Sequence, residues 1–177
     1  MLDRTVYTIL PQDSQELADA RFNRAVADVF DLMHSAGLLR QRTETGGVLV
    51  HGWDRMFRDG DDIRIAIIGI PERFTPEQSL AVAVEKFERL YDRPGDDQPN
   101  LTAWSTRDPS AIPARWGGAI VIDGRILSFS GLSEHADEAL IIGAAYLVGW
   151  LDREHALAYA AISSNKLVAE ILDRMII

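Results

Sequence analysis

The sequence predicts an α/β (α+β) domain with one antiparallel sheet of about four to five strands, built from two hairpins and flanked by helices. Paired β-prone runs meet at Asp59-Gly60 and again at Asp123-Gly124. Asp-Gly favours a type I′ turn, because both central residues need a positive φ. Apolar residues at helical spacing precede, separate and follow the two pairs. This order is typical of a two-layer or three-layer domain.

The composition is that of one ordinary globular domain, residues 1–177, with 47% apolar and 25% charged residues. A net charge of −9 without a Lys/Arg cluster argues against nucleic acid as a partner, since phosphate neutralisation requires a positive face. The absence of cysteine excludes disulfides and thiolate metal sites, and the sequence indicates no metal site. No signal peptide is visible at the N-terminus, so we expect a cytoplasmic protein that makes no contact with a membrane.

The chain is expected to begin with a helix. Residues 3–10 are either a short edge strand or a tail. Asp13 and Glu16 have the spacing of a capping box, and apolar residues then recur at helical spacing. This pattern predicts an N-terminal helix at about 14–36, which Gly37 ends.

The first hairpin follows this helix. Gly46-Gly47 opens it, and one strand runs through Trp53 towards Phe57 before the Asp59-Gly60 turn. The second strand, Ile63 to Ile70, has apolar residues on both faces, and we therefore expect it to be a central strand of the sheet.

A second helix starts at Thr75-Pro76, with threonine as the cap and proline at the first helical position. Arg93-Pro94-Gly95 ends it. The stretch from Asp92 to Arg115 is longer than most connections in compact domains, so we expect it to be functional or partly helical. Four residues in or beside it would line a pocket or bury a subunit interface, namely Trp104, Arg107, Asp108 and Trp116.

The segment from Trp116 to Trp150 organises the rest of the chain. After its hairpin, Ser133 is placed to cap a helix, and acidic residues occupy the first turns. From residue 139 to 151 this helix has no polar face, although a surface helix normally has one. The chain's own sheet can cover one side. The other side needs the C-terminal helix or a second subunit, so we expect a homo-oligomer formed through the apolar 139–151 helix.

The C-terminal segment predicts a helix at about 153–175, with an apolar stripe in its second half. The Ser163-Ser164 pair is a candidate break within it. The sequence contains no internal repeat.

The segment from 116 to 150 resembles the C-terminal half of the GlcG/HbpS-like proteins. The resemblance is carried by Trp116-Gly117-Gly118, the strand, Asp123-Gly124, the second strand, Gly131-Leu132-Ser133 and Asp137-Glu138. It extends from about Ile63 to Trp150 and implies a profilin-like fold, assembly into higher oligomers and, in some members, haem binding. The sequence departs from the family pattern at Ser128 and Glu134, where the family has glycine, and lacks the proline that usually follows the Gly-Gly pair. The shared motif is built of turn residues, which specify fold better than chemistry.

Seven residues are the candidate ligand-binding residues. They are Arg115, Trp116, Gly117, Gly118, His135, Asp137 and Glu138. Two explanations stay open for each group. The histidine and the acids could bind a metal or transfer protons, or could compensate the helix dipole. The two glycines could offer amides to a small anion beside Arg115, or could be required by close packing.

Haem is a candidate cofactor, and it requires an axial ligand such as histidine. The four histidines are His34, His51, His135 and His155. The first functional hypothesis is therefore a homo-oligomer that binds haem or a small organic acid. The alternatives are an interaction or structural oligomer without a ligand, and a small-molecule enzyme that uses His135, Asp137 and Glu138. The serine of Gly131-Leu132-Ser133 lacks the Gly-x-Ser-x-Gly setting of a hydrolase nucleophile.

Overall fold

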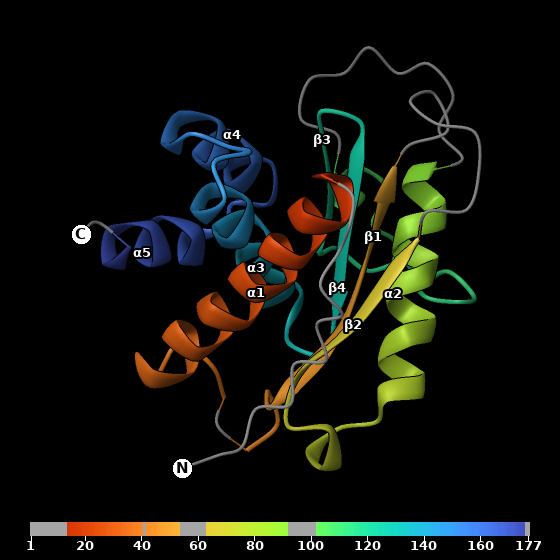
Figure 1. The fold of residues 1–177 in the computed structure, drawn as a ribbon. Helices are drawn as coiled ribbons and strands as arrows, with labels where there is room; N and C mark the ends of the chain where they lie inside the picture. Colours follow the sequence, from red (N-terminus) through yellow and green to blue (C-terminus); the bar gives the residue numbers. More distant parts are fainter. Residues whose placement is uncertain (1–13, 41, 54–62, 92–101, 176–177) are drawn as a thin grey trace.

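The protein is described here by a computed structural model, which covers residues 14–40, 42–53, 63–91 and 102–175. These residues include five α-helices and four strands (Figure 1). In chain order the α-helices and strands are α1 (Ser14–Ser35), β1 (Gly46–Trp53), β2 (Arg64–Gly69), α2 (Pro76–Tyr91), β3 (Ala119–Ile122), β4 (Arg125–Ser130), α3 (Glu134–Leu147), α4 (Arg153–Ser163) and α5 (Lys166–Arg174). Two short 3₁₀ helices, η1 (Pro71–Arg73) and η2 (Ala103–Thr106), lie in the connections.

The four strands form one antiparallel sheet in the order β2-β1-β4-β3. The predicted α+β fold with a sheet of about four strands is therefore confirmed. The predicted 3–10 strand, the Asp13 cap, the Asp59-Gly60 turn and the Arg93-Pro94-Gly95 helix end lie outside the described residues. A profilin-like arrangement is compatible with this topology and stays a prediction.

Helices cover both faces of the sheet, so the domain has three layers (Figure 1). On one face α2 packs against β1, β4 and β3, and its side chains form a small core with Val48, Val50 and Ile126. On the other face α1 and α3 pack against the sheet, with α4 and α5 behind α3. Strand alternation produces this division, because successive residues of β1 point to opposite faces.

The second hairpin forms at the predicted place. Asp123 has φ 47° and Gly124 has φ 76°. Both central residues of the turn thus have the positive φ that Asp-Gly tolerates. Residues Ala119–Ile122 pair with Arg125–Ser128 in register.

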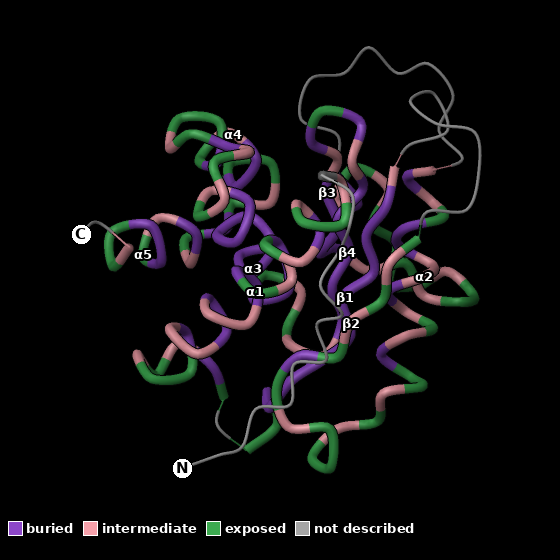
Figure 2. The backbone as a smooth tube through the Cα atoms, in the orientation of Figure 1, coloured by how far each residue is buried: buried purple, intermediate pink, exposed green. Residues whose placement is uncertain are grey.

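Among the described residues β2 is an outer strand of the sheet, so its prediction as a central strand is not confirmed there. The central strands are β1 and β4. The apolar residues of β2 suggested burial on both faces, but Ile65 and Ile67 are more than half exposed. Figure 2 shows the contrast between this edge strand and the buried strands beside it.

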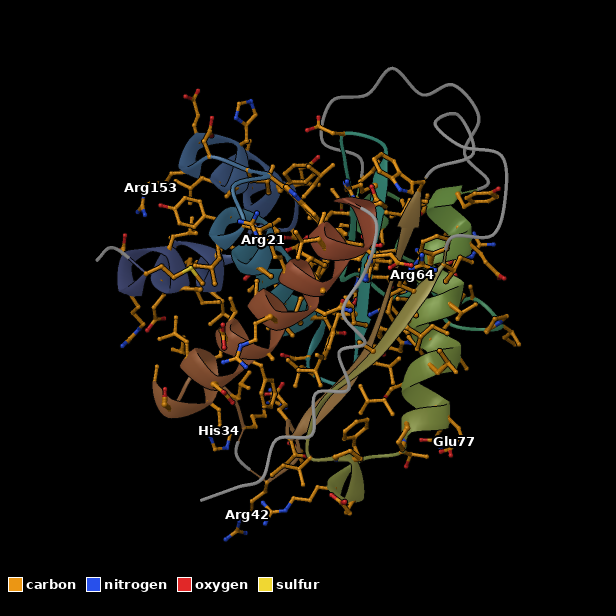
Figure 3. All side chains as sticks on the ribbon, viewed as in Figure 1. Arg21, His34, Arg42, Arg64, Glu77 and Arg153 are labelled. Carbon is orange, nitrogen blue, oxygen red and sulfur yellow. The ribbon has the colours of Figure 1, made fainter. Side chains whose placement is uncertain are left out.

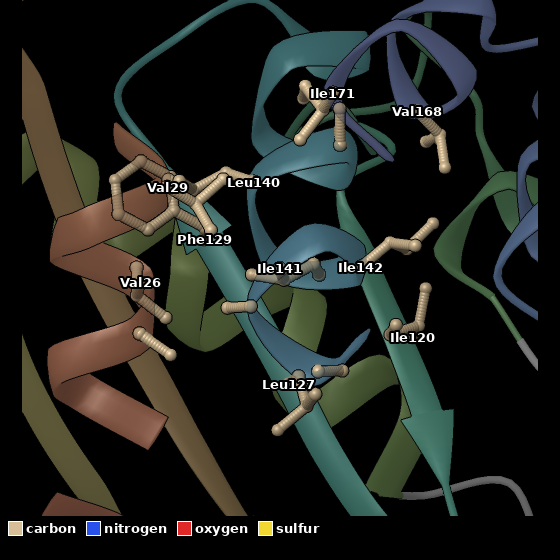
Figure 4. Close-up of a cluster of buried hydrophobic side chains, with 14 of the residues drawn as sticks. Val26, Val29, Ile120, Leu127, Phe129, Leu140, Ile141, Ile142, Val168 and Ile171 are labelled. Carbon is tan, nitrogen blue, oxygen red and sulfur yellow. The ribbon is translucent and has the colours of Figure 1, made fainter. Parts of the chain in front are cut away.

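The middle of the helix α3 is covered on all sides by its own chain. All ten residues from Ala136 to Ala145 are buried. Figure 4 shows Leu140, Ile141 and Ile142 between α1, α5 and the strands. At Gly143 an added Cβ would come within 3.2 Å of Val29 and 3.3 Å of Ile171, so the three helices meet closely there. Burial of this helix therefore does not require a second subunit, and the reason for predicting an interface at 139–151 is removed.

The C-terminal segment is broken as the sequence suggested. Ser164 adopts φ 57° between α4 and α5, and Asn165 caps α5 through a hydrogen bond from the Leu167 amide. The helix α3 ends at Leu147, and a turn at Gly149 leads to the Asp152 cap of α4. Among the described residues, no helix is both long and apolar enough to cross a membrane.

Candidate functional site

The candidate residues gather around the start of α3, at the end of the sheet where β3 begins and β4 ends. The Gly131-Leu132-Ser133 turn brings the chain from β4 into α3. Ser133 occupies the N-cap position, but its side chain makes no cap hydrogen bond. Instead, the Glu44 carboxylate accepts the Ser133 amide at 2.8 Å and the Arg40 amide at 2.6 Å. Ser133 thus has the expected cap position, but its hydroxyl does not make the expected hydrogen bond to the helix.

The Arg107 side chain lies over two indole rings near the surface of this region. The Arg107 guanidinium is 5.2 Å from the Trp104 ring centroid and 6.0 Å from that of Trp116. It donates to both carboxylate oxygens of Glu134, at 2.7 and 2.8 Å. The two charged side chains are 33% and 21% exposed, so solvent reaches the pair. Hydrogen bonds from Arg107 and Gly117 lower the pKa of the Glu134 carboxyl, although burial opposes them.

The imidazole of His135 packs against the Trp104 ring. Its centroid lies 4.8 Å from the centroid of the Trp104 ring. The Nε2 atom lies 3.1 Å from the Ser163 carbonyl oxygen. Because a carbonyl only accepts, Nε2 carries the proton, and Nδ1 of the neutral ring is left as an acceptor. We call Trp116, Arg107, Trp104 and His135 the aromatic–arginine stack.

Close packing explains both glycines at the start of β3. An added Cβ on Gly117 would lie 2.5 Å from the Trp104 ring. Gly118 has φ +93°, and its Cβ would lie 2.7 Å from that of Asp137. The Gly117 amide donates to Glu134 at 2.8 Å, so it is engaged within the protein rather than open to an anion.

Beneath the surface, Asp137 forms a buried ion pair with Lys86 of α2. The Lys86 ammonium donates to Asp137 Oδ2 at 2.9 Å and to the Phe129 carbonyl at 2.8 Å. The two side chains are 1% and 3% exposed. The second oxygen, Oδ1, accepts the Leu132 amide at 2.9 Å. Burial raises the pKa of Asp137 to about 7, while Lys86 acts to lower it. This pair connects the helices on the two faces of the sheet.

The carboxyl group of Glu138 is also buried, next to the turn between α4 and α5. Its Oε2 atom accepts hydrogen bonds from Ser163 Oγ and, at 2.9 Å, from Asn165 Nδ2. Its Oε1 atom is buried without a hydrogen-bond partner among the described residues, and so is Trp104 Nε1. Burial raises the pKa of Glu138, against the hydrogen bonds from Ser163 and Asn165.

The seven candidate residues therefore divide into three groups. Trp116, Gly117 and His135 lie at or beneath the aromatic–arginine stack. Gly118 and Asp137 belong to the Lys86 pair, and Glu138 faces the turn between α4 and α5. Arg115 is exposed, and its backbone forms a bridge with Asp108. The side chains of His135 and Glu138 both contact Ser163, through its carbonyl and its hydroxyl, whereas Asp137 engages Lys86 and the Leu132 amide.

Two important residues were not among the candidates. Lys86 stands on the buried stripe of α2 with Ala83, Phe87 and Leu90, and a lysine on an apolar stripe is the signal that indicates a buried partner. Glu134 was grouped with the helix-dipole acids, and its bond to Arg107 spans 27 residues, which no local pattern reveals.

The other histidines have separate surroundings. His51 is buried, with Nε2 2.9 Å from Asn23 Oδ1, and burial together with Arg125 and Arg64 lowers its pKa to about 3. His34 and His155 are exposed. In the described part of the chain no group of three or more His, Asp or Glu side chains is arranged to hold a metal ion.

No protein-family model, no curated protein and no solved structure matches this chain. The likeness to the GlcG/HbpS-like proteins thus depends on the sequence pattern between about Ile63 and Trp150 alone.

Proposed function

We propose that this is a small-ligand-binding protein of the GlcG/HbpS-like type and that it binds its ligand on the aromatic–arginine stack. The observation that carries the proposal is the partly exposed Arg107 guanidinium over two indole rings, with the His135 imidazole against one of them, Trp104. Indole faces bind flat rings and cations, and a guanidinium binds carboxylates through two parallel hydrogen bonds. A flat ligand with a carboxylate uses both properties.

Haem and small organic acids both satisfy this description. The carboxylate would compete with Glu134 for Arg107. An exposed ion pair contributes roughly 0–1 kcal/mol, so this exchange is inexpensive. For haem, His135 is the histidine at the site. It would bind iron through Nδ1, or through Nε2 after releasing the Ser163 carbonyl.

Binding is favoured over turnover because the two carboxyl groups among the three titratable candidates are buried and already hydrogen-bonded. Asp137 is held by Lys86 and the Leu132 amide, and Glu138 by Ser163 and Asn165. A general acid or base must reach the substrate within hydrogen-bond distance. Of these three side chains, His135 is the exposed one.

The test is a pair of titrations on the purified protein. Hemin is followed through its absorption, and benzoate, a flat monocarboxylate, through tryptophan fluorescence. We expect a saturable change with at least one probe. Trp104→Phe should weaken the response at least tenfold, because it replaces the indole that contacts both Arg107 and His135 with a smaller ring.

Two matched controls are available in the chain. Arg125 also lies between two indoles, 4.1 Å from Trp53 and 4.5 Å from Trp150, at a separate place. Arg107→Gln should therefore weaken benzoate binding, whereas Arg125→Gln should not. For hemin, His135→Ala is compared with His155→Ala. Flat titrations with both probes would reject the proposal.

An interaction protein without a ligand is the second candidate. It is supported by a different observation, the exposed isoleucines of the edge strand β2.

A further inference from the structure

The exposed face of β2 carries a stripe of isoleucines. Ile63, Ile65 and Ile67 alternate along the chain and are 48%, 56% and 53% exposed. Ile65 pairs with Val50 and Ile67 with Val48, so this stripe shares the sheet face that α2 covers farther in. We call these three residues the isoleucine stripe. A contiguous apolar patch on an edge strand is typical of a surface that binds another protein.

The helices explain why this stripe is open. The helix α2 packs on β1, β4 and β3, and α1 packs on the opposite face of β2, where Ala66 and Ile68 belong to the main core. The sheet order leaves the outer edge of β2 without a neighbouring strand among the described residues. The strand thus has the composition of a buried strand and the position of an edge strand.

We propose that this edge pairs with the β2 edge of a second copy of the same chain, in antiparallel orientation about a two-fold axis. An antiparallel edge is complementary to itself, since each outward amide meets a carbonyl of the other copy. Such an interface is isologous and closes as a dimer. It places the two isoleucine stripes beside each other and joins the two four-stranded sheets into one.

Charge also favours a second copy as the occupant. The isoleucine stripe itself is uncharged, so two chains with a net charge of −9 each can approach there with little local repulsion. On the other face of β2, Arg64 Nε lies 3.5 Å from Oδ2 of Asp19 on α1. Arg64 is labelled in Figure 3. Asp19 is also 3.7 Å from Arg125, so these charges are paired within each copy. The isoleucine stripe itself offers no opposite charge to an acidic or a basic partner.

The length of the stripe sets the register. The three isoleucines of each copy overlap fully when Ile65 lies on the axis, because Ile63 then faces the second copy's Ile67. Residues that face each other across an antiparallel pair have Cα atoms about 4.5–5.5 Å apart, within the range of a disulfide. The chain has no cysteine of its own, so a single introduced cysteine reports on this register without interference.

The first test is the mass in solution of the full chain across the micromolar range. We expect a dimer. The double variant I65K/I67K should shift the dissociation constant at least a hundredfold towards monomer while the circular dichroism spectrum stays unchanged. The control is Leu147→Lys, which alters an exposed leucine on α3. This variant should remain dimeric. A monomeric natural chain, or a dimer that persists in I65K/I67K, overturns the proposal.

The second test remains decisive if I65K/I67K does not fold. Under mild oxidation Ile65→Cys should form a disulfide-linked dimer, whereas Ala161→Cys, at an exposed position on α4, should stay monomeric. Equal crosslinking of the two variants, or none at position 65, contradicts the two-fold register. Neither result depends on ligand binding, so this proposal and the proposed function can fail separately.

Discussion

At the scale of single residues, the molecule buries charged groups within its layers and gives each of them hydrogen-bond partners of its own. The buried Lys86–Asp137 pair is the strongest case, since each charge has a second partner, the Phe129 carbonyl or the Leu132 amide. Removing one member of such a pair leaves the other charge buried without compensation, whereas removing both can be nearly neutral.

This asymmetry gives the first prediction. Lys86→Met alone and Asp137→Leu alone should each lower the free energy of unfolding by about 3–5 kcal/mol. The double variant should lose much less than the two single losses together, because the residues are in contact. Urea denaturation of the three variants measures these free energies. Single losses below about 1 kcal/mol, the level of exposed pairs, would contradict the buried pair.

The buried imidazole of His51 gives a prediction about pH. Its pKa is lowered from 6.5 to about 3, so the unfolded chain binds this proton more tightly than the folded protein. The stabilising contribution is present above pH 6.5 and is lost as the pH falls towards 3. Between pH 7 and pH 4 the loss is on the order of 3 kcal/mol.

The measurement is denaturation at several pH values for the natural chain and for His51→Gln, which can still hydrogen-bond to Asn23. The variant should lose less stability on acidification. His155→Gln, at an exposed histidine, should keep the full loss. Identical acid profiles for His51→Gln and the natural chain would contradict a neutral buried imidazole.

At the scale of elements, the N-caps of α4 and α5 offer a matched comparison. Asp152 accepts the His155 amide at 2.8 Å on the surface. Asn165 accepts the Leu167 amide and also donates to the buried Glu138 carboxylate and to the His135 carbonyl. Asp152→Ala should cost about 1 kcal/mol. Asn165→Ala should cost about 2–4 kcal/mol, because it also removes a donor from a buried carboxylate. Thermal and urea unfolding compare the two variants, and equal costs would show that the Glu138 contact contributes nothing.

Most elements could be predicted from local signals. Gly37 ends α1, Pro76 begins α2, Asp123-Gly124 forms the hairpin turn and Ser163-Ser164 divides the C-terminal helices. Each depends on the conformational preference of one or two residues, which sequence displays directly. The position of β2 could not be predicted, because an apolar strand has the same pattern in the centre of a sheet and at an edge that another chain covers.

The position of the candidate residues at the start of α3 could be predicted, but the partners of their side chains could not. Turn residues located the start of α3, yet the partners of its acids come from distant segments, Lys86 from α2 and Arg107 from the loop before β3. Contacts of this kind depend on the tertiary arrangement, which helical spacing does not encode. The same limitation applies to Glu44, which accepts the Ser133 amide from 89 residues away in the chain.

At the scale of the whole molecule, the three layers explain both proposed surfaces. The layer formed by α1, α4 and α5 encloses α3 and leaves its N-terminal end accessible beside the Trp104 ring. The layer formed by α2 covers three strands and leaves β2 open. Ligand binding and self-association are therefore assigned to different parts of the protein.

The central claim, that the aromatic–arginine stack binds a flat carboxylate ligand, can be tested by following the indole N–H signals of the four tryptophans by NMR during titration. With hemin or benzoate we expect the signals of Trp104 and Trp116 to shift or broaden in a saturable way, while those of Trp53 and Trp150 stay in place. Movement confined to Trp53 and Trp150, or no movement at any of the four, would contradict the account.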